Sequence, residues 1–392
     1  MPSAEPYLSI VVAARNDDHG GDFHKRMQVF IQGLLAQCER HQLDAEFLLV
    51  EWNPPELRPR LKEVFIWPRG IERCTVRIIE VPQSTHMRFK NADRIPFFQF
   101  IAKNVGIRRA RGEFVLATNI DILFSDQLMA RLARRDLNSD SYYRIDRYDV
   151  SAHIPENASL DEQLNYCQNH VLRVFRRDGT YSHVTHAFYR IYPRSSGMLG
   201  KSLLLAERIL TEAKVVASLF ITNKTFRRNL LRYEHYRSNV KSGVYSDRLH
   251  RIFEFLETPQ RSRLHTNASG DFTLMGKDRW SGLRGYPELT LHGMHIDSIL
   301  CYMAHYLPLR ELIFRDPMRI YHIDHLHSWT PEVGRTEAFY RRLRERGIPW
   351  MSHEELNELA LRMKEHRRPI IFNDEKWGLG GEELEESIFG PD

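Results

Sequence analysis

An acidic turn after an apolar run is the part of the chain best suited to chemistry. Phe114 to Ala117 predicts a buried strand, and Asn119 and Asp121 stand where that strand ends. Ligands of α/β sheets commonly bind at the carboxyl ends of parallel strands, where a carboxylate can hold a hard divalent cation that also binds a diphosphate. The turn therefore predicts a cation site at Asp121, with the carbonyl oxygen of Asn119 as an uncharged second ligand. A strand-to-loop turn capped by Asn and Asp is the plainer alternative.

A histidine-rich run is the second group suited to binding a metal. His322, His325 and His327 lie in a predicted strand from Arg319 to His327. The two-residue repeat of a strand puts His322 on one face and His325 on the other until the strand bends. A zinc site normally has further ligands, and no cysteine or Glu-x-x-His pair is near. Histidines packed or hydrogen-bonded at a strand edge are the alternative.

The elements that would position these groups alternate between strands and helices. Strand-like runs and helix-like spacings follow one another at Leu8 to Ala14, Phe23 to Cys38, Phe47 to Val50, Val76 to Val81 and Pro96 to Arg109. Such alternation predicts an α/β fold whose mostly parallel sheet carries helices on both faces. No G-x-G-x-x-G follows the first strand, which disfavours a dinucleotide-binding dehydrogenase.

Polar side chains stand instead at successive strand ends. They are Arg15, Asn16 and Asp17, then Glu51 and Asn53, then Asn119 and Asp121. Because the ends of parallel strands meet at one edge of a sheet, these side chains can converge on one ligand and bind a nucleoside by hydrogen bonds. Turn and cap chemistry would explain each of them as well.

Composition and charge exclude few classes of protein. Of 392 residues, 56 are Lys or Arg and 51 are Asp or Glu, and the net charge of +5 suits an anionic nucleotide or a phosphorylated acceptor without requiring nucleic acid. The four cysteines form no Cys-x-x-Cys pair, so free thiols in a reducing compartment are expected. No apolar run approaches the ~20 residues of a membrane-spanning helix, and no signal-peptide pattern is present. We therefore expect a cytoplasmic protein.

The motifs together resemble those of GT-A-type nucleotide-sugar glycosyltransferases. The stretch from Ala102 to Phe124 is similar to the Asn-x-Gly, Ala-x-Gly and Asp-x-Asp motifs of that class, with Asn119 in place of the first Asp. The strings VEWNPP, TNIDILF, GDFTLM and YHIDH further resemble a family-2-like bacterial branch of GT-A proteins. The resemblance covers roughly residues 8–124 and 266–328, and the order of the motifs carries it.

The resemblance implies a GT-A-type, Rossmann-like sheet and a division of the chain. Residues 1–150 would be a nucleotide-sugar-binding half, 151–265 a mostly helical insertion, 266–330 an acceptor-binding half of the same core, and 331–392 a C-terminal helical extension. The implied enzyme is a metal-dependent, hexosyltransferase-like glycosyltransferase that uses Mn²⁺ or Mg²⁺ and a nucleotide-sugar donor, with UDP-sugars favoured. Its acceptor would be a hydroxyl of a glycan or small molecule, in bacterial surface or exopolysaccharide synthesis.

Residue roles follow from the same resemblance. The donor would be bound by Arg15, Asn16, Asp17, Glu51, Asn53, Lys103, Asn104, Arg108, Asn119 and Asp121, and the metal by Asp121 with His322 or His325. The acceptor would contact Asp271, Trp280 and Tyr286. A sugar hydroxyl needs a base to take its proton, and the resemblance assigns that role to Asp297 or His295. A first-turn helix acid is the alternative for Asp297.

Other functions stay open. A nucleotidyltransferase uses a similar sheet with a Gly- and Arg/Lys-rich loop after the first strand, which RNDDHGGDFHKR partly satisfies. A non-catalytic nucleotide- or sugar-binding relative would tolerate the loss of the first Asp. Ser195 to Ser202 is similar to a phosphate-binding P-loop but lacks its first glycine. Leu203 to Tyr236 could contact an anionic membrane as a basic amphipathic helix, although a packed helix with a charged face is the commoner outcome.

Overall fold

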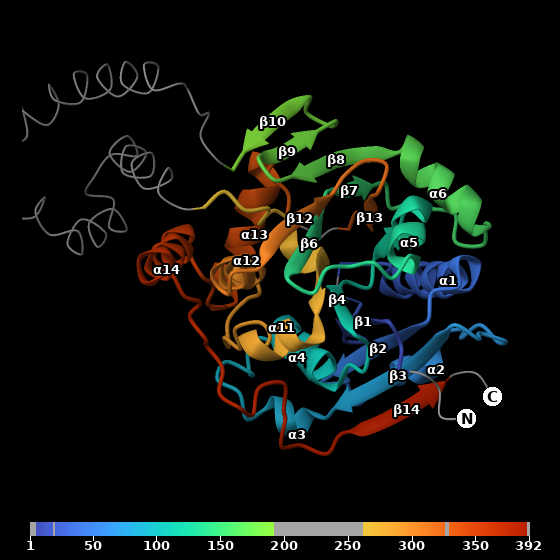
Figure 1. The fold of residues 1–392 in the computed structure, drawn as a ribbon, viewed down its shortest axis with the longest axis horizontal. Helices are drawn as coiled ribbons and strands as arrows, with labels where there is room; N and C mark the ends of the chain where they lie inside the picture. Colours follow the sequence, from blue (N-terminus) through green and yellow to red (C-terminus); the bar gives the residue numbers. More distant parts are fainter. Residues whose placement is uncertain (1–4, 19, 192–261, 326–328, 390–392) are drawn as a thin grey trace, which may run out of the picture. The chain divides into compact units, whose positions relative to one another are not determined.

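The computed structural model describes residues 5–18, 20–191, 262–325 and 329–389. The chain separates into two compact units, residues 1–191 with 262–392 and residues 192–261. The second unit lies outside the described residues, and with it the P-loop-like run Ser195 to Ser202 and the basic segment Leu203 to Tyr236. The first unit is a mixed α/β structure in which helices flank two sheets (Figure 1). The predicted α/β class is thereby confirmed.

An eight-stranded sheet forms the centre of this unit. Its strands are β1 (Leu8–Ala14), β2 (Ala45–Trp52), β3 (Cys74–Val81), β4 (Phe114–Thr118), β6 (Ser141–Ile145), β11 (Phe272–Gly276), β12 (Arg310–Phe314) and β14 (Glu385–Phe389). They lie in the order β12-β6-β11-β4-β1-β2-β3-β14, and only β11 and β14 run against the direction of the others. Parallel strands are buried on both faces, which explains why β1 is a continuous apolar run.

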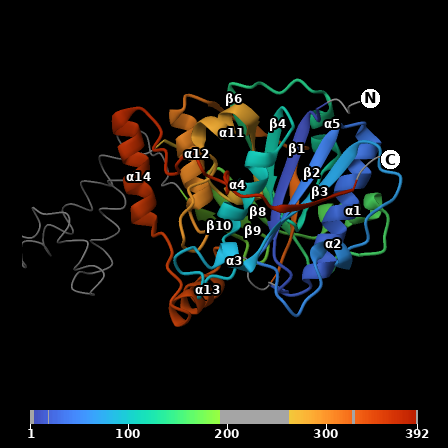
Figure 2. The same ribbon diagram turned by 90° about the horizontal axis from the view of Figure 1, so that it is seen from below.

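Helices cover both faces of the sheet (Figure 2). The helices are α1 (Phe23–His41) and α5 (Asp126–Ala133) in one core, and α4 (Gln99–Arg109), α11 (Lys277–Leu283) and α12 (Ile296–Tyr306) in the other. Side chains of β1 alternate between the two cores, since Val11 packs with α4 and Ile10 with α1. At Gly106 of α4, an added Cβ would lie 2.5 Å from Val11 Cγ1. The glycine therefore permits the close approach of α4 to the sheet.

A second, six-stranded sheet connects the acidic turn to the histidine-rich strand. Its members are β5 (Ile122–Phe124), β7 (Arg147–Val150), β8 (Val171–Arg176), β9 (Gly179–Ser182), β10 (Ala187–Arg190) and β13 (Ile320–Ile323). β13 lies between β7 and β5, parallel to β7 and antiparallel to β5, and His322 pairs with Ile122. Because β5 starts directly after Asp121, this pairing places His322 beside the turn.

The described parts of the insertion and of the C-terminal extension contain strands as well as helices. The remaining helices are α2 (Leu61–Val64), α3 (Gln83–His86), α6 (Leu160–Asn169), α13 (Val333–Glu345), α14 (His353–His366) and the 3-10 helix η2 (Ser269–Asp271). Of the predicted insertion, the structure describes residues 151–191 and 262–265, and residues 151–191 contain α6 and the strands β8, β9 and β10, which extend the second sheet. After α14 the chain returns as β14 along the edge strand β3, where Ser387 pairs with Ile78.

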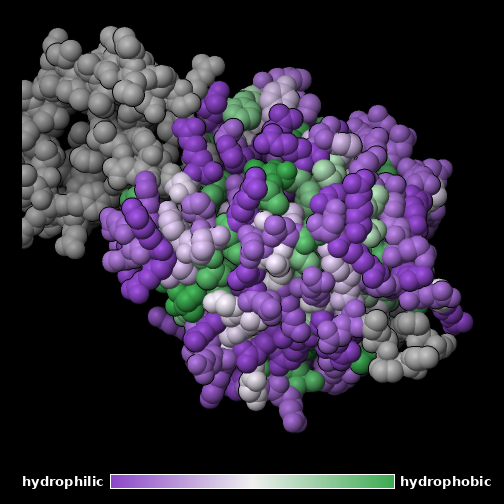
Figure 3. Space-filling model, viewed as in Figure 1, coloured by the Kyte–Doolittle hydropathy of each residue, from purple (hydrophilic) through white to green (hydrophobic). Residues whose placement is uncertain are grey.

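The described residues contain no candidate membrane-spanning helix. None of their helices is long and apolar enough to cross a bilayer. On the face seen in Figure 3, hydrophilic residues predominate and hydrophobic residues gather in separate small patches.

Candidate functional site

Three predicted metal ligands lie together at the carboxyl end of β4. Asp121 Oδ2 is 3.7 Å from His322 Nε2 and 3.5 Å from His325 Nε2. The ligand-type atoms of the three residues all lie within 4.8 Å of one another. β13 ends at Ile323, so His325 lies beyond the strand and is not bound to its alternation of faces, which explains why both histidines reach the same carboxylate although their positions differ by an odd number. His327 lies outside the described residues.

A buried carboxylate fixes the orientation of His322. His322 Nδ1 lies 3.1 Å from Asp149 Oδ1, and the Asp149 side chain has no exposed surface. Burial alone would raise the pKa of Asp149, but Arg147, His322 and Arg173 outweigh it and lower this pKa to about 2. Because Asp149 is therefore ionised, the proton of a neutral His322 belongs on Nδ1, which leaves Nε2 as a lone pair facing Asp121. Metal-binding histidines commonly show this carboxylate contact.

Asp121 itself combines one strong ion pair with one unsatisfied oxygen. Oδ2 accepts a hydrogen bond of 2.7 Å from Arg26 Nη1, and both side chains are buried. Oδ1 is buried and has no hydrogen-bond partner in the part of the chain that the structure describes. A buried carboxylate oxygen without a partner is costly. One carboxylate and two imidazoles form a mixed oxygen and nitrogen donor set that fits a divalent transition metal.

Asn119, expected as the second oxygen ligand, is turned away from Asp121. Its Oδ1 accepts hydrogen bonds from Gln99 (2.8 Å) and from Lys103 Nζ (2.7 Å), while its Nδ2 donates to Asp271 Oδ1 at 2.5 Å. These bonds use both ends of the amide. Asn119 thus holds Lys103 and Asp271 in place, and its role as a second oxygen ligand stays a prediction.

Lys103 is a buried cation at the centre of the site. Its Nζ donates to Asn119 Oδ1 and to the carbonyl of Gly270, each at 2.7 Å. Burial lowers the pKa of Lys103 to about 8, against the opposing attraction of Asp271, Asp297 and Asp121. The three carboxylates thus favour the charged form of Lys103, although burial opposes it.

Asp271 and Asp297 belong to the same network. Asp271 accepts hydrogen bonds from Asn119 and, at 2.6 Å, from Arg147 Nη1. The Nε of Arg147 also lies 2.9 Å from Asp149 Oδ1. Asp297 Oδ2 accepts from the backbone N–H of Gly270 at 2.7 Å, and burial raises the pKa of Asp297 above its usual range. Gly270 thus connects Asp297 to Lys103, because its carbonyl accepts from the lysine.

His295, the alternative base, lies at the start of α12 in a left-handed conformation with φ of 68°. Its ring packs 5.4 Å from that of His353, the first residue of α14. Its surroundings therefore differ from those of Asp297, although only one residue separates them.

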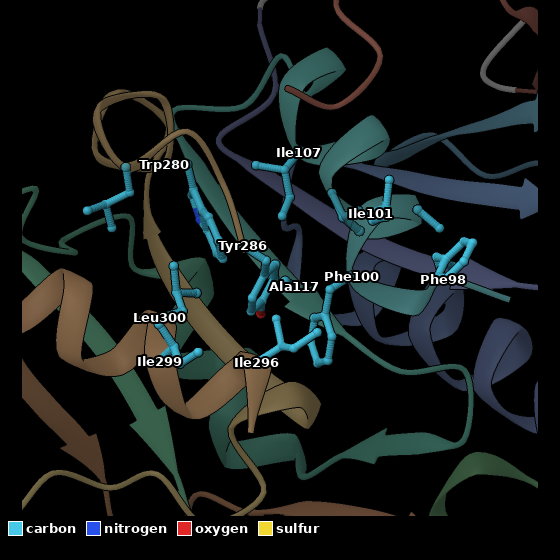
Figure 4. Close-up of a cluster of buried hydrophobic side chains, with 14 of the residues drawn as sticks. Phe98, Phe100, Ile101, Ile107, Ala117, Trp280, Tyr286, Ile296, Ile299 and Leu300 are labelled. Carbon is cyan, nitrogen blue, oxygen red and sulfur yellow. The ribbon is translucent and has the colours of Figure 1, made fainter. Parts of the chain in front are cut away.

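Trp280 and Tyr286 lie in the hydrophobic core (Figure 4). Trp280 is 1% exposed and donates its indole N–H to the carbonyl of Val115, and Tyr286 is 0% exposed. Figure 4 shows both rings among Phe100, Ile299 and other side chains of α4 and α12. Both rings are closed off from solvent and have no exposed surface for an acceptor, so acceptor binding by Trp280 and Tyr286 stays a prediction that their burial does not support.

Two expected donor-binding residues lie in structural contacts elsewhere. Asn104 exchanges hydrogen bonds with the backbone of Tyr286 and donates to Glu288. Arg108 donates to the carbonyls of Glu375 and Trp377, so it anchors the C-terminal segment. Neither contact involves the Asp121 cluster.

The polar residues at the first two strand ends are bound to neighbouring loops. Asn16 donates to the carbonyl of Pro59 and contacts His24 Nε2, and Asn53 donates to the carbonyl of Pro96. Glu51 accepts from the N–H of Leu61, the first residue of α2, and burial raises the pKa of Glu51 to about 7.

Arg15 and Asp17 form a pair that is only partly buried. Arg15 Nη1 lies 2.8 Å from Asp17 Oδ2, and its Nε donates to the carbonyl of Asn53. Of the polar groups at the first two strand ends, this pair is therefore the one that keeps exposed surface.

Two residues of the site have no role in the sequence prediction. Arg26 contacts Asp121, and Asp149 contacts His322. A signal for each is visible in the chain: Arg26 ends the charged string RNDDHGGDFHKR, and Asp149 lies in a strand dense in charged residues, which is unusual for a buried element.

Comparison with known proteins gives little beyond this geometry. No protein-family model matches the chain, and neither does any curated protein. A solved structure described as GalNAc-T7 with UDP, GalNAc and Mn²⁺ is similar at 10% sequence identity with a TM-score of 0.41. The similar region covers 96% of this chain and 56% of that one, so the chain spans little more than half of that protein's length.

Proposed function

We propose that the protein is a glycosyltransferase that moves a sugar from a nucleoside-diphosphate donor to a hydroxyl group. The carrying observation is the meeting of Asp121, His322 and His325 at the carboxyl end of β4, with an unpartnered oxygen on Asp121. This is the sheet edge at which α/β proteins bind nucleotides. The motif order that resembles GT-A-type enzymes supports the same assignment.

The residues present fit a divalent cation. Asp121, His322 and His325 would hold it, and the two imidazoles favour Mn²⁺ over Mg²⁺, which prefers oxygen ligands. When bound, such an ion supplies charge that stabilises the diphosphate as it leaves the sugar. The buried guanidinium of Arg26 and the ammonium of Lys103 add positive charge around the same edge.

We place the general base at Asp297. Its raised pKa makes the carboxylate a stronger base than a solvated aspartate, and the N–H of Gly270 fixes one of its oxygens. It would take the proton of the acceptor hydroxyl as the glycosidic bond forms. Lys103 donates to the carbonyl of the same glycine and would thereby fix the position of the Asp297 carboxylate relative to the donor-binding part of the site. His295 is the second candidate for the base.

The substrate classes follow the resemblance. A UDP-sugar is the favoured donor, and a glycan or small hydroxyl compound is the acceptor. Bacterial surface or exopolysaccharide synthesis is the proposed setting. Because Trp280 and Tyr286 are buried, Asp297 is the best-placed of the residues predicted from this half of the chain to face the acceptor.

A panel of nucleotide-sugars, assayed with and without Mn²⁺, tests the proposal. Release of a nucleoside diphosphate that requires Mn²⁺ and is lost in Asp121→Asn is expected. Release of pyrophosphate from a nucleoside triphosphate and a sugar phosphate would identify a nucleotidyltransferase instead. Binding of nucleotide-sugars without turnover of any of them would identify a binding protein.

A further inference from the structure

Arg26 occupies a direction on Asp121 that a bound cation would need. The residue lies in the first turn of α1, and its Nη1 is 2.7 Å from Asp121 Oδ2. The side chains of Arg26 and Asp121 are only 4% and 7% exposed. Arg26 Nε also donates to the carbonyl of Gly21 at 3.2 Å. The ion pair is therefore shielded from water, and charge interactions are stronger in such a buried environment than in water.

The two histidines approach the same oxygen as Arg26 does. His322 Nε2 and His325 Nε2 lie 3.7 and 3.5 Å from Oδ2. A cation held between these two nitrogens and Oδ2 would share that oxygen with the guanidinium, whereas a cation on Oδ1, which has no partner among the described residues, would leave Arg26 in place. Asp121 is also the one carboxylate among the three ligands, so Arg26 already neutralises the negative charge that should attract the metal.

We infer that Arg26 and the divalent cation compete for Asp121 Oδ2, and that the displaced guanidinium binds the diphosphate of the donor. The second half rests on the proposed function. A planar guanidinium can donate two parallel hydrogen bonds to phosphate oxygens, so a diphosphate is a suitable new partner. In the protein without nucleotide, Arg26 holds the cation affinity down. When the diphosphate arrives, it removes this competition, and cation and nucleotide therefore strengthen each other's binding.

Calorimetric titration with Mn²⁺ alone tests the competition. Arg26→Gln should bind Mn²⁺ at least about ten-fold more tightly than the wild type, because repulsion between neighbouring cations is removed. Arg26→Lys keeps the charge and should stay close to the wild type. Arg77→Gln is the matched control, since Arg77 forms an equally buried 2.8 Å ion pair with Glu46 and contacts none of the three ligands. It should leave Mn²⁺ affinity unchanged.

A second measurement uses the wild-type protein, in case Arg26→Gln does not fold. Phenylglyoxal modifies accessible arginines, and peptide mass spectrometry locates the product. Mn²⁺ should increase modification of Arg26, and Mn²⁺ with UDP should protect it. Unchanged or weaker Mn²⁺ affinity in Arg26→Gln, or Arg26 modification that Mn²⁺ does not increase, would overturn the inference and indicate that the metal uses Oδ1 while Arg26 stays in place.

The two proposals fail in different ways. If wild type and Arg26→Gln bind Mn²⁺ equally well and the wild type transfers sugar, the competition between Arg26 and the cation is rejected and the proposed function stands. Tighter Mn²⁺ binding by Arg26→Gln, together with a wild-type protein that turns over no nucleotide-sugar, would reject the proposed function and leave the competition standing.

Discussion

His322 contacts two carboxylates through its two ring nitrogens. Nδ1 lies 3.1 Å from Asp149 Oδ1, and Nε2 lies 3.7 Å from Asp121 Oδ2. Asp149 is in turn held by Arg147 and Arg173, so the ring is anchored from the interior of the protein and directed at the turn after β4. A neutral His322 with its proton on Nδ1 would present the lone pair of Nε2 to a metal at Asp121.

Replacing Asp149 should weaken metal binding without touching a ligand. Asp149→Asn removes the charge that favours a proton on Nδ1, and loss of such a partner typically costs roughly 10–100-fold in metal affinity. Mn²⁺ calorimetry measures the loss. Asp146→Asn is the control, because Asp146 forms a similar 2.9 Å contact with His265 and should not alter Mn²⁺ binding. Equal losses in the two variants would mean that general destabilisation explains the effect.

Substitutions at two adjacent glycines can distinguish the effect of backbone strain from a direct effect on His325. Gly20 and Gly21 have φ of 82° and 80°, but an added Cβ at Gly20 would clash with His325 Nδ1, whereas at Gly21 it would meet nothing within 4 Å. Both Gly→Ala variants should lose about 1–2 kcal/mol of stability, because alanine is strained at positive φ. Only Gly20→Ala should also weaken Mn²⁺ binding. Equal Mn²⁺ affinities in calorimetry would show that His325 is not a ligand.

Removing the proposed base should affect turnover and spare donor binding. Asp297→Asn should cut the rate by roughly 10²–10⁴-fold, the usual contribution of general-base catalysis, with donor affinity nearly unchanged. Because burial raises the pKa of Asp297, the wild-type rate should fall on acidification through a pH above the ordinary 3.8. If His295 is the base, His295→Gln should carry the loss of turnover instead. Sugar transfer that survives both substitutions would leave this segment without a base and favour a retaining reaction.

Glu51 should make stability depend on pH. Its folded-state pKa of about 7 lies above the ordinary 4.5, so the stability it contributes is fully present below pH 4.5 and is lost as pH rises through about 7. Glu51→Gln removes this penalty and should gain up to about 3 kcal/mol relative to the wild type between pH 4.5 and 8. Thermal melts at both pH values measure the gain. Glu113→Gln, at an exposed carboxylate, is the control and should show no such difference.

Much of the fold is predictable from local patterns. The apolar runs of β1 and β4 and the helical spacing of α1 and α4 define the sheet and its covering helices, and the structure confirms the α/β class. The edge strand β14 is not predictable in this way, because Glu385 to Phe389 is mostly polar and becomes a strand only by pairing with β3, about 300 residues earlier. Long-range pairing has no local signal.

The site is predictable in part for the same reason. The order of the motifs that resemble GT-A-type enzymes leads to one hypothesis for Asp121, His322 and His325. In the structure, the pairing of β13 with β5 places these residues together. The direction in which a side chain faces is a property of packing. Trp280 faces the sheet from α11, and Asn119 turns toward Lys103, and neither orientation can be deduced from residue type.

The affinity of UDP with Mn²⁺ and with EDTA tests the central claim most directly. Calorimetry should show clearly tighter UDP binding in Mn²⁺ for the wild-type protein, and the gain should vanish in Asp121→Asn, which loses the one carboxylate of the proposed metal site. Equal UDP affinity in Mn²⁺ and in EDTA would contradict the account, because Asp121, His322 and His325 would then hold no metal that contacts the diphosphate.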